Sequence, residues 1–251
     1  MNPQPTALPR QRSKDKDFYR NYKLRFPGRV LLAGLHFGMW LWLDLEKQGW
    51  ENIPRTGPVI MMINHVAFLD PVILTGMMPR PMVSMAKVEA YEDKIIGPLL
   101  RSFDSIPVNR GAADLSALRR VLDALEAGLA VLIAPEGHRS ETGGLGEAHE
   151  GIAFVAYRAK VPIVPVGISG TPAFKHRYWK MQKTHVTYRF GQPFYLDPGG
   201  ERATAEMLKQ MTSEAMYQLA ALLPPEQRGL YEDLEQATAN YVKFAPQGKC
   251  D

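Results

Sequence analysis

The sequence is poor in cysteine. Its 251 residues include a single one, Cys250. One cysteine cannot form an internal disulfide, and it offers no cluster of thiolates to a metal ion. Disulfide-stabilised scaffolds and cysteine-based metal centres are therefore excluded.

Long apolar runs are also missing. The most apolar stretch, Val30 to Leu43, is fourteen residues long with His36 as its only polar residue, whereas a helix that spans a bilayer needs about 20 residues. Residues 1–17 are polar and contain proline. They do not have the apolar centre of a secretory signal, and we expect a disordered tail there.

The excess of positive charge is small. Thirty Lys and Arg against 26 Asp and Glu give a formal net charge of +4. That charge is too low to argue for nucleic-acid binding in a sequence without zinc-finger spacings or RNA-binding motifs. It suits a protein that works beside anionic phosphates or anionic lipid.

What the sequence does contain is an alternation of short apolar runs with longer amphipathic ones. The amphipathic runs predict helices over residues 114–127, 151–160 and 203–222, the first capped by Asp114. The apolar runs predict strands over residues 59–63, 82–86, 105–108, 130–134, 163–168 and 186–190. This order is typical of an α/β fold, with a mostly parallel central sheet and helices on both faces. Ligands of such sheets bind beyond the carboxyl ends of the strands.

The first such strand is followed by a histidine and a carboxylate, His65 and Asp70. On a helix two side chains five positions apart point about 140° away from each other, so they can meet only if residues 65–69 form a loop. Pro71 favours that loop, because a residue before proline avoids the α region, and Asp70 is then expected to cap the helix that follows. Two interpretations stay open: a loop histidine beside a helix cap, or a general base oriented by a carboxylate.

Two arginines follow two further predicted strands. Arg139 lies in the segment PEGHRS at residues 135–140, and Arg110 comes two residues after the strand at 105–108. A guanidinium group is a planar fork for an oxygen anion. Gly137 permits a sharp turn, and Glu136 is placed to orient the arginine or to accept a hydrogen bond from a substrate hydroxyl. For each arginine alone a surface salt bridge is the simpler account. Together with His65, at three strand ends, the two arginines predict an anion-binding pocket beside a base.

Residues 18–48 form a basic, aromatic and apolar segment that we expect to be helical. Basic and aromatic residues alternate before the apolar stretch at Val30–Leu43, a pattern typical of an anchor in the membrane interface. The alternative is a helix packed on the protein's own core. Both are compatible if one face lies on the domain and the other on lipid.

Around these residues the sequence resembles the glycerolipid acyltransferase family, in particular its 1-acylglycerol-3-phosphate acyltransferases. The family's block Asn-His-x4-Asp-Pro is matched at residues 64–71, and its block Pro-Glu-Gly-Thr-Arg-Ser at residues 135–140. Two further blocks are matched by IPVNRG at residues 106–111 and by VPIVPV at residues 161–166. The resemblance extends from about residue 49 to residue 170 with the blocks in order.

The resemblance implies an enzyme that moves a fatty acyl group from a thioester to the free hydroxyl of lysophosphatidate, giving phosphatidate. His65 would act as the general base and Asp70 would orient it. The segment Met85-Ala86-Lys87 also looks like the family. The substrate contacts that the resemblance implies are Asn64, Lys87, Arg110, Glu136, Gly137 and Arg139.

Partners and location follow from the same resemblance. Acyl-CoA or acyl carrier protein delivers the acyl group as a co-substrate; no cofactor, metal or nucleic acid is expected. Because both substrates carry acyl chains, we expect association with anionic lipid at the cytoplasmic face of a membrane. The expected organisation is a tail at 1–17, the membrane-associating segment at 18–48 and an acyltransferase domain at 49–251.

Two positions depart from the family pattern. His138 stands where the family has threonine, and His149-Glu150 stand where a basic residue often precedes the glycine. These departures leave open another acceptor, such as a lysophospholipid with a larger head group or a lyso-aminolipid. A non-catalytic lipid-binding protein is the remaining alternative, although such a protein has no use for a base beside its orienting carboxylate.

Overall fold

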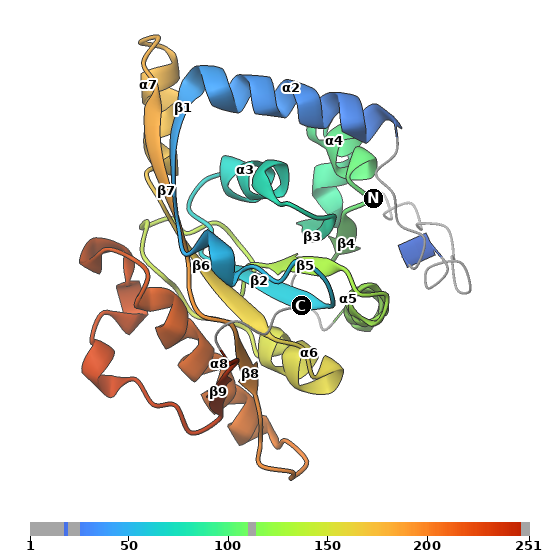
Figure 1. The fold of residues 1–251 in the computed structure, drawn as a ribbon, viewed down its shortest axis with the longest axis vertical. Coiled ribbons are helices and arrows are strands. Elements are labelled where there is room, and N and C mark those ends of the chain that lie inside the picture. The colour runs from blue at the N-terminus through green and yellow to red at the C-terminus, as the bar shows by residue number, and fades with distance from the viewer. Residues whose placement is uncertain (1–17, 20–25, 110–113, 247–251) are drawn as a thin grey trace, which may run out of the picture.

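The computed structural model describes residues 18–19, 26–109 and 114–246. The predicted tail at 1–17 and the predicted substrate contact Arg110 lie outside the described residues. One sheet of nine strands organises the fold, and its main path has the order β1-β7-β6-β2-β5-β3-β4 (Figure 1). The strands of this path are β1 (Leu43–Gln48), β2 (Val59–Ile63), β3 (Met82–Lys87), β4 (Ile106–Val108), β5 (Ala130–Ile133), β6 (Ile163–Ser169) and β7 (Thr184–Phe190).

The sheet is mostly parallel, as the sequence predicts. The parallel block runs from β6 through β2, β5 and β3 to β4. Strand β7 is antiparallel to β6 and parallel to the edge strand β1. Two short strands, β8 (Phe194–Leu196) and β9 (Val242–Phe244), extend the sheet beside β6 in antiparallel fashion.

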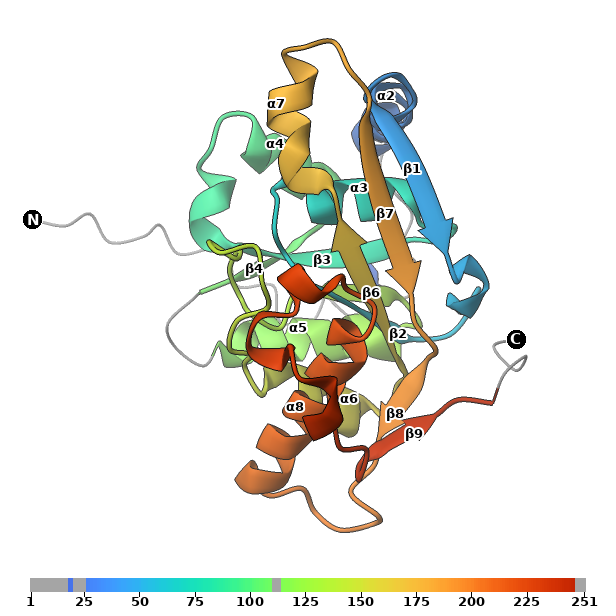
Figure 2. The ribbon, with the colours of Figure 1, turned by 90° about the vertical axis from the view of Figure 1, so that its left-hand side faces the viewer.

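Helices cover both faces of the sheet (Figures 1 and 2). On one face lie α2 (Phe26–Trp42) and α3 (Leu69–Met77), and on the other α5 (Leu115–Glu126), α6 (Gly151–Ala159) and α8 (Ala205–Ala220). The central strand β2 shows why both faces are needed. All five of its residues are buried: Ile60 and Met62 join one core, and Val59, Met61 and Ile63 join the other. A strand without a polar face is stable only between two layers.

The remaining elements are short. Helix α4 (Ile96–Ser102) lies beside α2, and α7 (Phe174–Tyr178) precedes β7. Single 3-10 turns occupy Trp50–Asn52, Val88–Tyr91, Thr171–Ala173, Pro225–Gln227, Gly229–Tyr231 and Leu234–Gln236.

Local chemistry accounts for two of the helix positions. Asp114 caps α5 as predicted, because its carboxylate accepts hydrogen bonds from the backbone of Ser116 and Ala117. The buried carboxylate of Glu214 on α8 accepts from the Thr238 hydroxyl and from the backbone N–H of Asn240 and Tyr241. That carboxylate fixes the C-terminal segment across α8.

The prediction that residues 18–48 are helical throughout is wrong at its end. Helix α2 stops at Trp42, and residues 43–48 form the edge strand β1. The physical reason is the alternation of Leu43 and Leu45, which face the core, with Asp44 and Glu46, which face solvent. Among the described residues no helix combines the length and the apolar character needed to cross a membrane.

Candidate active site

His65 and Asp70 meet at the carboxyl end of β2. Nδ1 of His65 lies 3.3 Å from Oδ2 of Asp70, and the carboxylate is fully buried while the imidazole is 16% exposed. The prediction of a loop between them holds, but the prediction that Asp70 caps the helix is wrong. Helix α3 begins at Leu69, with Phe68 in the cap position. The carboxylate instead turns back and accepts hydrogen bonds of 2.7 and 2.6 Å from the backbone N–H groups of Val66 and Ala67.

Two residues that the sequence analysis missed complete the surroundings of Asp70. The Thr171 hydroxyl donates a 2.6 Å hydrogen bond to Oδ1, and the Tyr188 hydroxyl donates to the Asp70 carbonyl oxygen at 3.1 Å. Burial, followed by the nearby Asp70 charge, raises the pKa of Tyr188 well above its usual value, so this phenol stays a neutral donor. Both residues lie more than 100 positions away in the sequence, and only the crossover between β2, β6 and β7 brings them here.

Asn64 and Glu136, predicted as substrate contacts, hold the backbone. The Asn64 amide donates to the carbonyl of Ile168 at 2.9 Å and accepts from its N–H at 2.8 Å, which fastens β2 to the end of β6. The buried Glu136 accepts from the N–H groups of Gly146 and His65 at 2.9 and 3.4 Å. Both side chains thus have a structural role and neither lines the cavity described below; their contact with substrate stays a prediction.

Burial affects the protonation of Glu136. Desolvation raises the pKa of this carboxyl, and the hydrogen bonds from Gly146 and His65 oppose that shift. The same segment holds His65 a second time, since the Ser140 N–H donates to the His65 carbonyl oxygen at 2.7 Å. The backbone N–H and the carbonyl oxygen of His65 are thus both hydrogen-bonded to the segment 135–140, which holds the loop that carries the predicted base.

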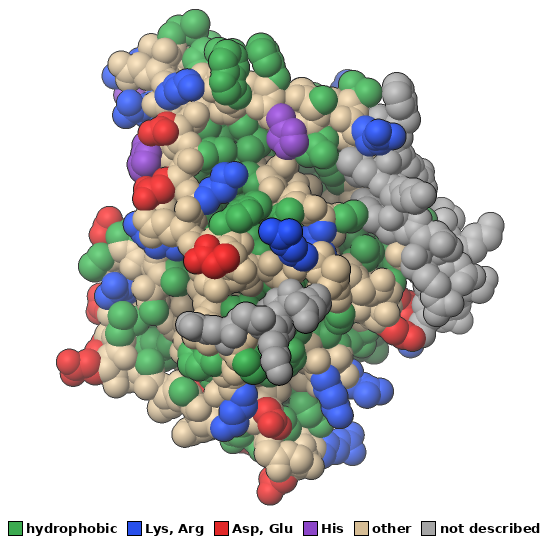
Figure 3. Space-filling model, viewed as in Figure 1, with side chains coloured by type: hydrophobic (Ala, Val, Ile, Leu, Met, Phe, Trp, Pro, Cys, Tyr) green, Lys and Arg blue, Asp and Glu red, His purple; other side chains and the backbone are tan. Residues whose placement is uncertain are grey.

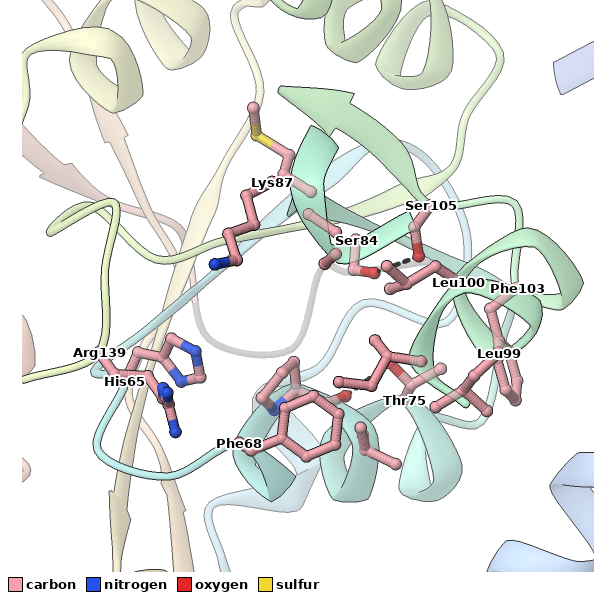
Figure 4. A pocket seen from close by; sticks show the side chains of 16 residues that line it. His65, Phe68, Thr75, Ser84, Lys87, Leu99, Leu100, Phe103, Ser105 and Arg139 are labelled. Atoms are coloured by element: carbon pink, nitrogen blue, oxygen red, sulfur yellow. Dashed lines mark hydrogen bonds between the residues drawn. The ribbon is translucent and has the colours of Figure 1, made fainter. Parts of the chain in front are cut away.

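A cavity of about 320 Å³ opens beside His65. Figure 4 shows its two chemically different ends: His65, Arg139 and Lys87 gather at one end, and Leu99, Leu100 and Phe103 lie at the other. Helices α3 and α4 and strand β3 supply the apolar walls, which include Val72, Thr75, Met85 and Ile96. The predicted contacts Lys87 and Arg139 are therefore placed next to the predicted base.

The motif around Arg139 is shaped by Gly137. This glycine has φ +70°, and a Cβ atom there would come within 3.1 Å of the His149 ring. The left-handed backbone favours glycine here, and a larger residue would also have to displace the His149 ring by a few tenths of an ångström. His138 is exposed, its Nδ1 lies 3.1 Å from the Arg139 carbonyl oxygen, and it does not line the cavity. In this structure it behaves as a turn residue.

This geometry suits one kind of chemistry. A carboxylate at Nδ1 fixes the imidazole tautomer and leaves the other ring nitrogen able to accept a proton from a group in the cavity. Two cationic side chains at the same end favour an anion, and the apolar end favours a hydrocarbon chain. Within the described ranges no group of three or more metal-ligating side chains is arranged to hold a metal ion.

The comparisons with known proteins agree with this geometry. A family model described as Acyltransferase matches residues 44–169, about half of the chain, which includes His65, Asp70 and every residue that lines the cavity. The chain belongs to the acyltransferase family. The solved 1-acyl-sn-glycerophosphate acyltransferase PlsC of Thermotoga maritima shares the fold of this acyltransferase: the TM-score is 0.57 at 23% identity, and the alignment covers 89% of this chain and 88% of the other.

Curated relatives carry the name 1-acyl-sn-glycerol-3-phosphate acyltransferase. The protein of Bacillus subtilis is 28% identical over 170 residues, which cover 67% of this chain and 82% of the relative. The protein of Pseudomonas aeruginosa is 25% identical over 201 residues, covering 76% and 77%. A chloroplast protein of Brassica napus is 28% identical over 156 residues, but this acyltransferase spans only 45% of its length, and 61% of this chain is aligned.

Proposed function

We propose that this acyltransferase transfers a fatty acyl group from a thioester to the free hydroxyl of lysophosphatidate, with phosphatidate and a free thiol as products. One observation carries the proposal: the His65–Asp70 pair opens into a cavity with two cations at the same end and a hydrocarbon surface at the other. The names of the relatives support the acceptor. Acyl-CoA and acyl carrier protein are both compatible donors.

In the proposed reaction His65 removes the hydroxyl proton as the acceptor oxygen attacks the thioester carbonyl carbon. A new C–O bond forms, and the tetrahedral intermediate collapses by breaking the C–S bond. The imidazolium returns the proton to the leaving thiolate, so His65 ends neutral. Asp70 stabilises the imidazolium, as a carboxylate does in a serine hydrolase triad, but here the substrate is the nucleophile. The step needs no cofactor and no covalent acyl-enzyme.

Arg139 and Lys87 are proposed to bind the acceptor's phosphate. Guanidinium and ammonium groups form charge-assisted hydrogen bonds with phosphate oxygens. With the phosphate held there, the glycerol hydroxyl lies near His65, and such positioning contributes several kcal/mol to lowering the barrier. An acyl chain then extends between α3 and α4, towards Leu99 and Phe103.

Membrane association is proposed to begin at α2. This helix packs one face on α3 through Leu35 and Met39, whose atoms would lie within 3.1 Å of a Cβ at Gly76. Its opposite face exposes Val30, Phe37 and Trp40. A helix with two apolar faces is typical of one that lies between protein and lipid. The cytoplasmic face stays a prediction from the family resemblance.

The decisive experiment compares His65→Ala and wild-type protein in a thioester-consumption assay with a panel of acceptors: lysophosphatidate, lysophospholipids with larger head groups, a lyso-aminolipid and water. We expect wild type to prefer lysophosphatidate and His65→Ala to lose at least a thousandfold in turnover with unchanged melting temperature. A folded His65→Ala variant with near-normal turnover contradicts the base assignment. If wild type prefers another lysolipid, the proposed acceptor is wrong but the proposed acyl-transfer chemistry stands.

A further inference from the structure

A projecting tip lies between α7 and β7 and has no part in the site described above. Backbone hydrogen bonds close its turn, from Lys180 N–H to the Arg177 carbonyl and from Met181 N–H to the Tyr178 carbonyl. The Arg177 guanidinium also donates to the Lys183 carbonyl at 2.9 Å. The tip is therefore a turn whose backbone is closed by hydrogen bonds.

The side chains at the end of this turn are large, apolar and exposed. Trp179 is 77% and Met181 is 79% exposed. Met181 has φ +55°, in the left-handed region that glycine or asparagine adopts at lower cost. Exposed tryptophan and methionine in a closed turn favour a partner that is apolar and yet wet at its border, because the indole ring is amphipathic.

The tip is continuous with the outward face of α2. The rings of Trp42 and Tyr178 pack with centroids 4.8 Å apart, and the Lys183 ammonium lies 5.8 Å from the Trp40 ring centre. Figures 1 and 2 place α7 and α2 at the same end of the molecule, and Figure 3 shows hydrophobic side chains projecting there with Lys and Arg beside them. The two features form one surface.

The charges of the tip have one sign. Residues 176–183 include Arg177, Lys180 and Lys183 and no Asp or Glu, and all three basic side chains are exposed. Each basic residue held near an anionic bilayer favours binding. A protein partner would have to supply acidic groups around an apolar pocket, whereas an anionic bilayer offers both chemistries without a specific shape.

The tip also has a fixed relation to the site. Strand β6 is parallel to β2 and ends at the same edge as His65, and it leads through Thr171 directly into α7. A bilayer that meets both the tip and α2 therefore lies at the edge of the sheet where the cavity opens. A contact surface built from both α2 and the tip constrains the tilt of the protein more than contact through one helix does.

We propose that Trp179 and Met181, with Arg177, Lys180 and Lys183, form a second membrane contact that inserts into the interface of an anionic bilayer. This contact acts together with the outward face of α2, and it rests on the proposed function only in that the substrates are lipids. The tip orients the cavity towards the bilayer.

The test measures partition of the full chain into sedimented vesicles, made of phosphatidylcholine with one quarter phosphatidylglycerol or of phosphatidylcholine alone. We expect Trp179→Ser/Met181→Ser to lower partition into anionic vesicles at least tenfold. Lys180→Gln/Lys183→Gln should remove much of the difference between the two vesicles. The matched control is Leu115→Ser/Leu230→Ser, which alters two apolar side chains of similar exposure outside this surface, 70% and 69%, and should leave partition unchanged.

Turnover measurements distinguish a role of the tip in membrane contact from a role in the acyl-transfer reaction. With short-chain thioester and acceptor below their micelle concentrations, the tip variant should keep wild-type turnover, and with vesicle-borne substrates it should lose at least fivefold. Wild-type partition of the tip variant, or a wild-type dimer that the tip substitutions dissociate, overturns the proposal. If the wild type acylates no lysolipid, the proposed function fails while the partition results still decide on the tip.

Discussion

The hydroxyl of Thr171 donates a 2.6 Å hydrogen bond to the carboxylate of Asp70, and both side chains are buried. Thr171 begins the 3-10 turn that follows β6, so this contact joins the end of one strand to the helix that follows another. Thr171 does not line the cavity; it positions the carboxylate that in turn positions His65.

Replacing Thr171 with valine should therefore lower kcat and leave KM nearly unchanged. A hydrogen bond to a charged group contributes about 1.5–3 kcal/mol, which corresponds to a loss of roughly ten- to a hundredfold in kcat if the whole effect appears in the transition state. Thr171→Ser keeps the hydroxyl and should restore most of the rate. Steady-state kinetics of both variants provide the check, and wild-type kcat in Thr171→Val would exclude a positioning role.

Arg139→Ala should act on binding of the acceptor. Because the guanidinium is proposed to contact the phosphate and not the reacting oxygen, the apparent KM for lysophosphatidate should rise about ten- to a hundredfold. Lys87→Ala should have a smaller effect of the same kind, since ammonium binds phosphate as a point charge. The control acceptor is monoacylglycerol, which lacks the phosphate and should respond to neither substitution. An unchanged KM for lysophosphatidate would place the phosphate elsewhere.

Asn64→Ala should reduce stability more than its size suggests. It removes two hydrogen bonds and leaves the N–H and carbonyl of Ile168 without their partner in a buried site, at about 1–3 kcal/mol for each unsatisfied group. We expect a loss of about 2–4 kcal/mol in the free energy of unfolding, measured by urea titration. Asn240→Ala changes an exposed asparagine and should have little effect. Equal stability of the two variants would contradict the structural role given to Asn64.

The contact of β1 with β7 predicts that the stability of the fold depends on pH. The pKa of His185 is raised, mainly by its hydrogen bond to the Asp44 carboxylate, 3.0 Å away. A histidine whose pKa is higher in the folded state stabilises the fold below its unfolded pKa of about 6.5, and the contribution is lost as the pH rises through the folded value. Asp44→Asn should therefore lower the NMR titration midpoint of His185. It should also cost stability at pH 5.5 but not at pH 8.5. Identical midpoints in both proteins would refute the pairing.

The sequence predicts those features that depend on local periodicity. The buried run at 59–63, the amphipathic helix after Asp114 and the mostly parallel sheet follow from spacing alone, and the structure has them. The edge strand β1 was missed because its alternation Leu43-Asp44-Leu45-Glu46 directly continues an apolar helix. A two-residue period is hard to separate from a 3.6-residue period over so few positions.

The motif residues of the site could be named from the sequence, but the residues that hold them in place could not. His65, Asp70, Lys87 and Arg139 could be named because they stand in short patterns at strand ends. Thr171 and Tyr188 have no such pattern, and their roles depend on which strands become neighbours. Asn64 and Glu136 belong to the motifs, but the motifs do not reveal that their polar atoms bond to backbone groups.

The attachment of His65 to the segment 135–140 has a consequence for reading mutational data. The His65 amide is held by Glu136, 71 positions later, and its carbonyl by Ser140. Two motifs far apart in the sequence are therefore joined by hydrogen bonds, and a displacement of one is expected to displace the other. Substituting Glu136, whose side chain makes the first of these bonds, should displace His65 together with the turn that carries Arg139, whereas the Ser140 bond comes from its backbone N–H and survives a change of side chain. A slow enzyme produced that way says nothing by itself about head-group recognition.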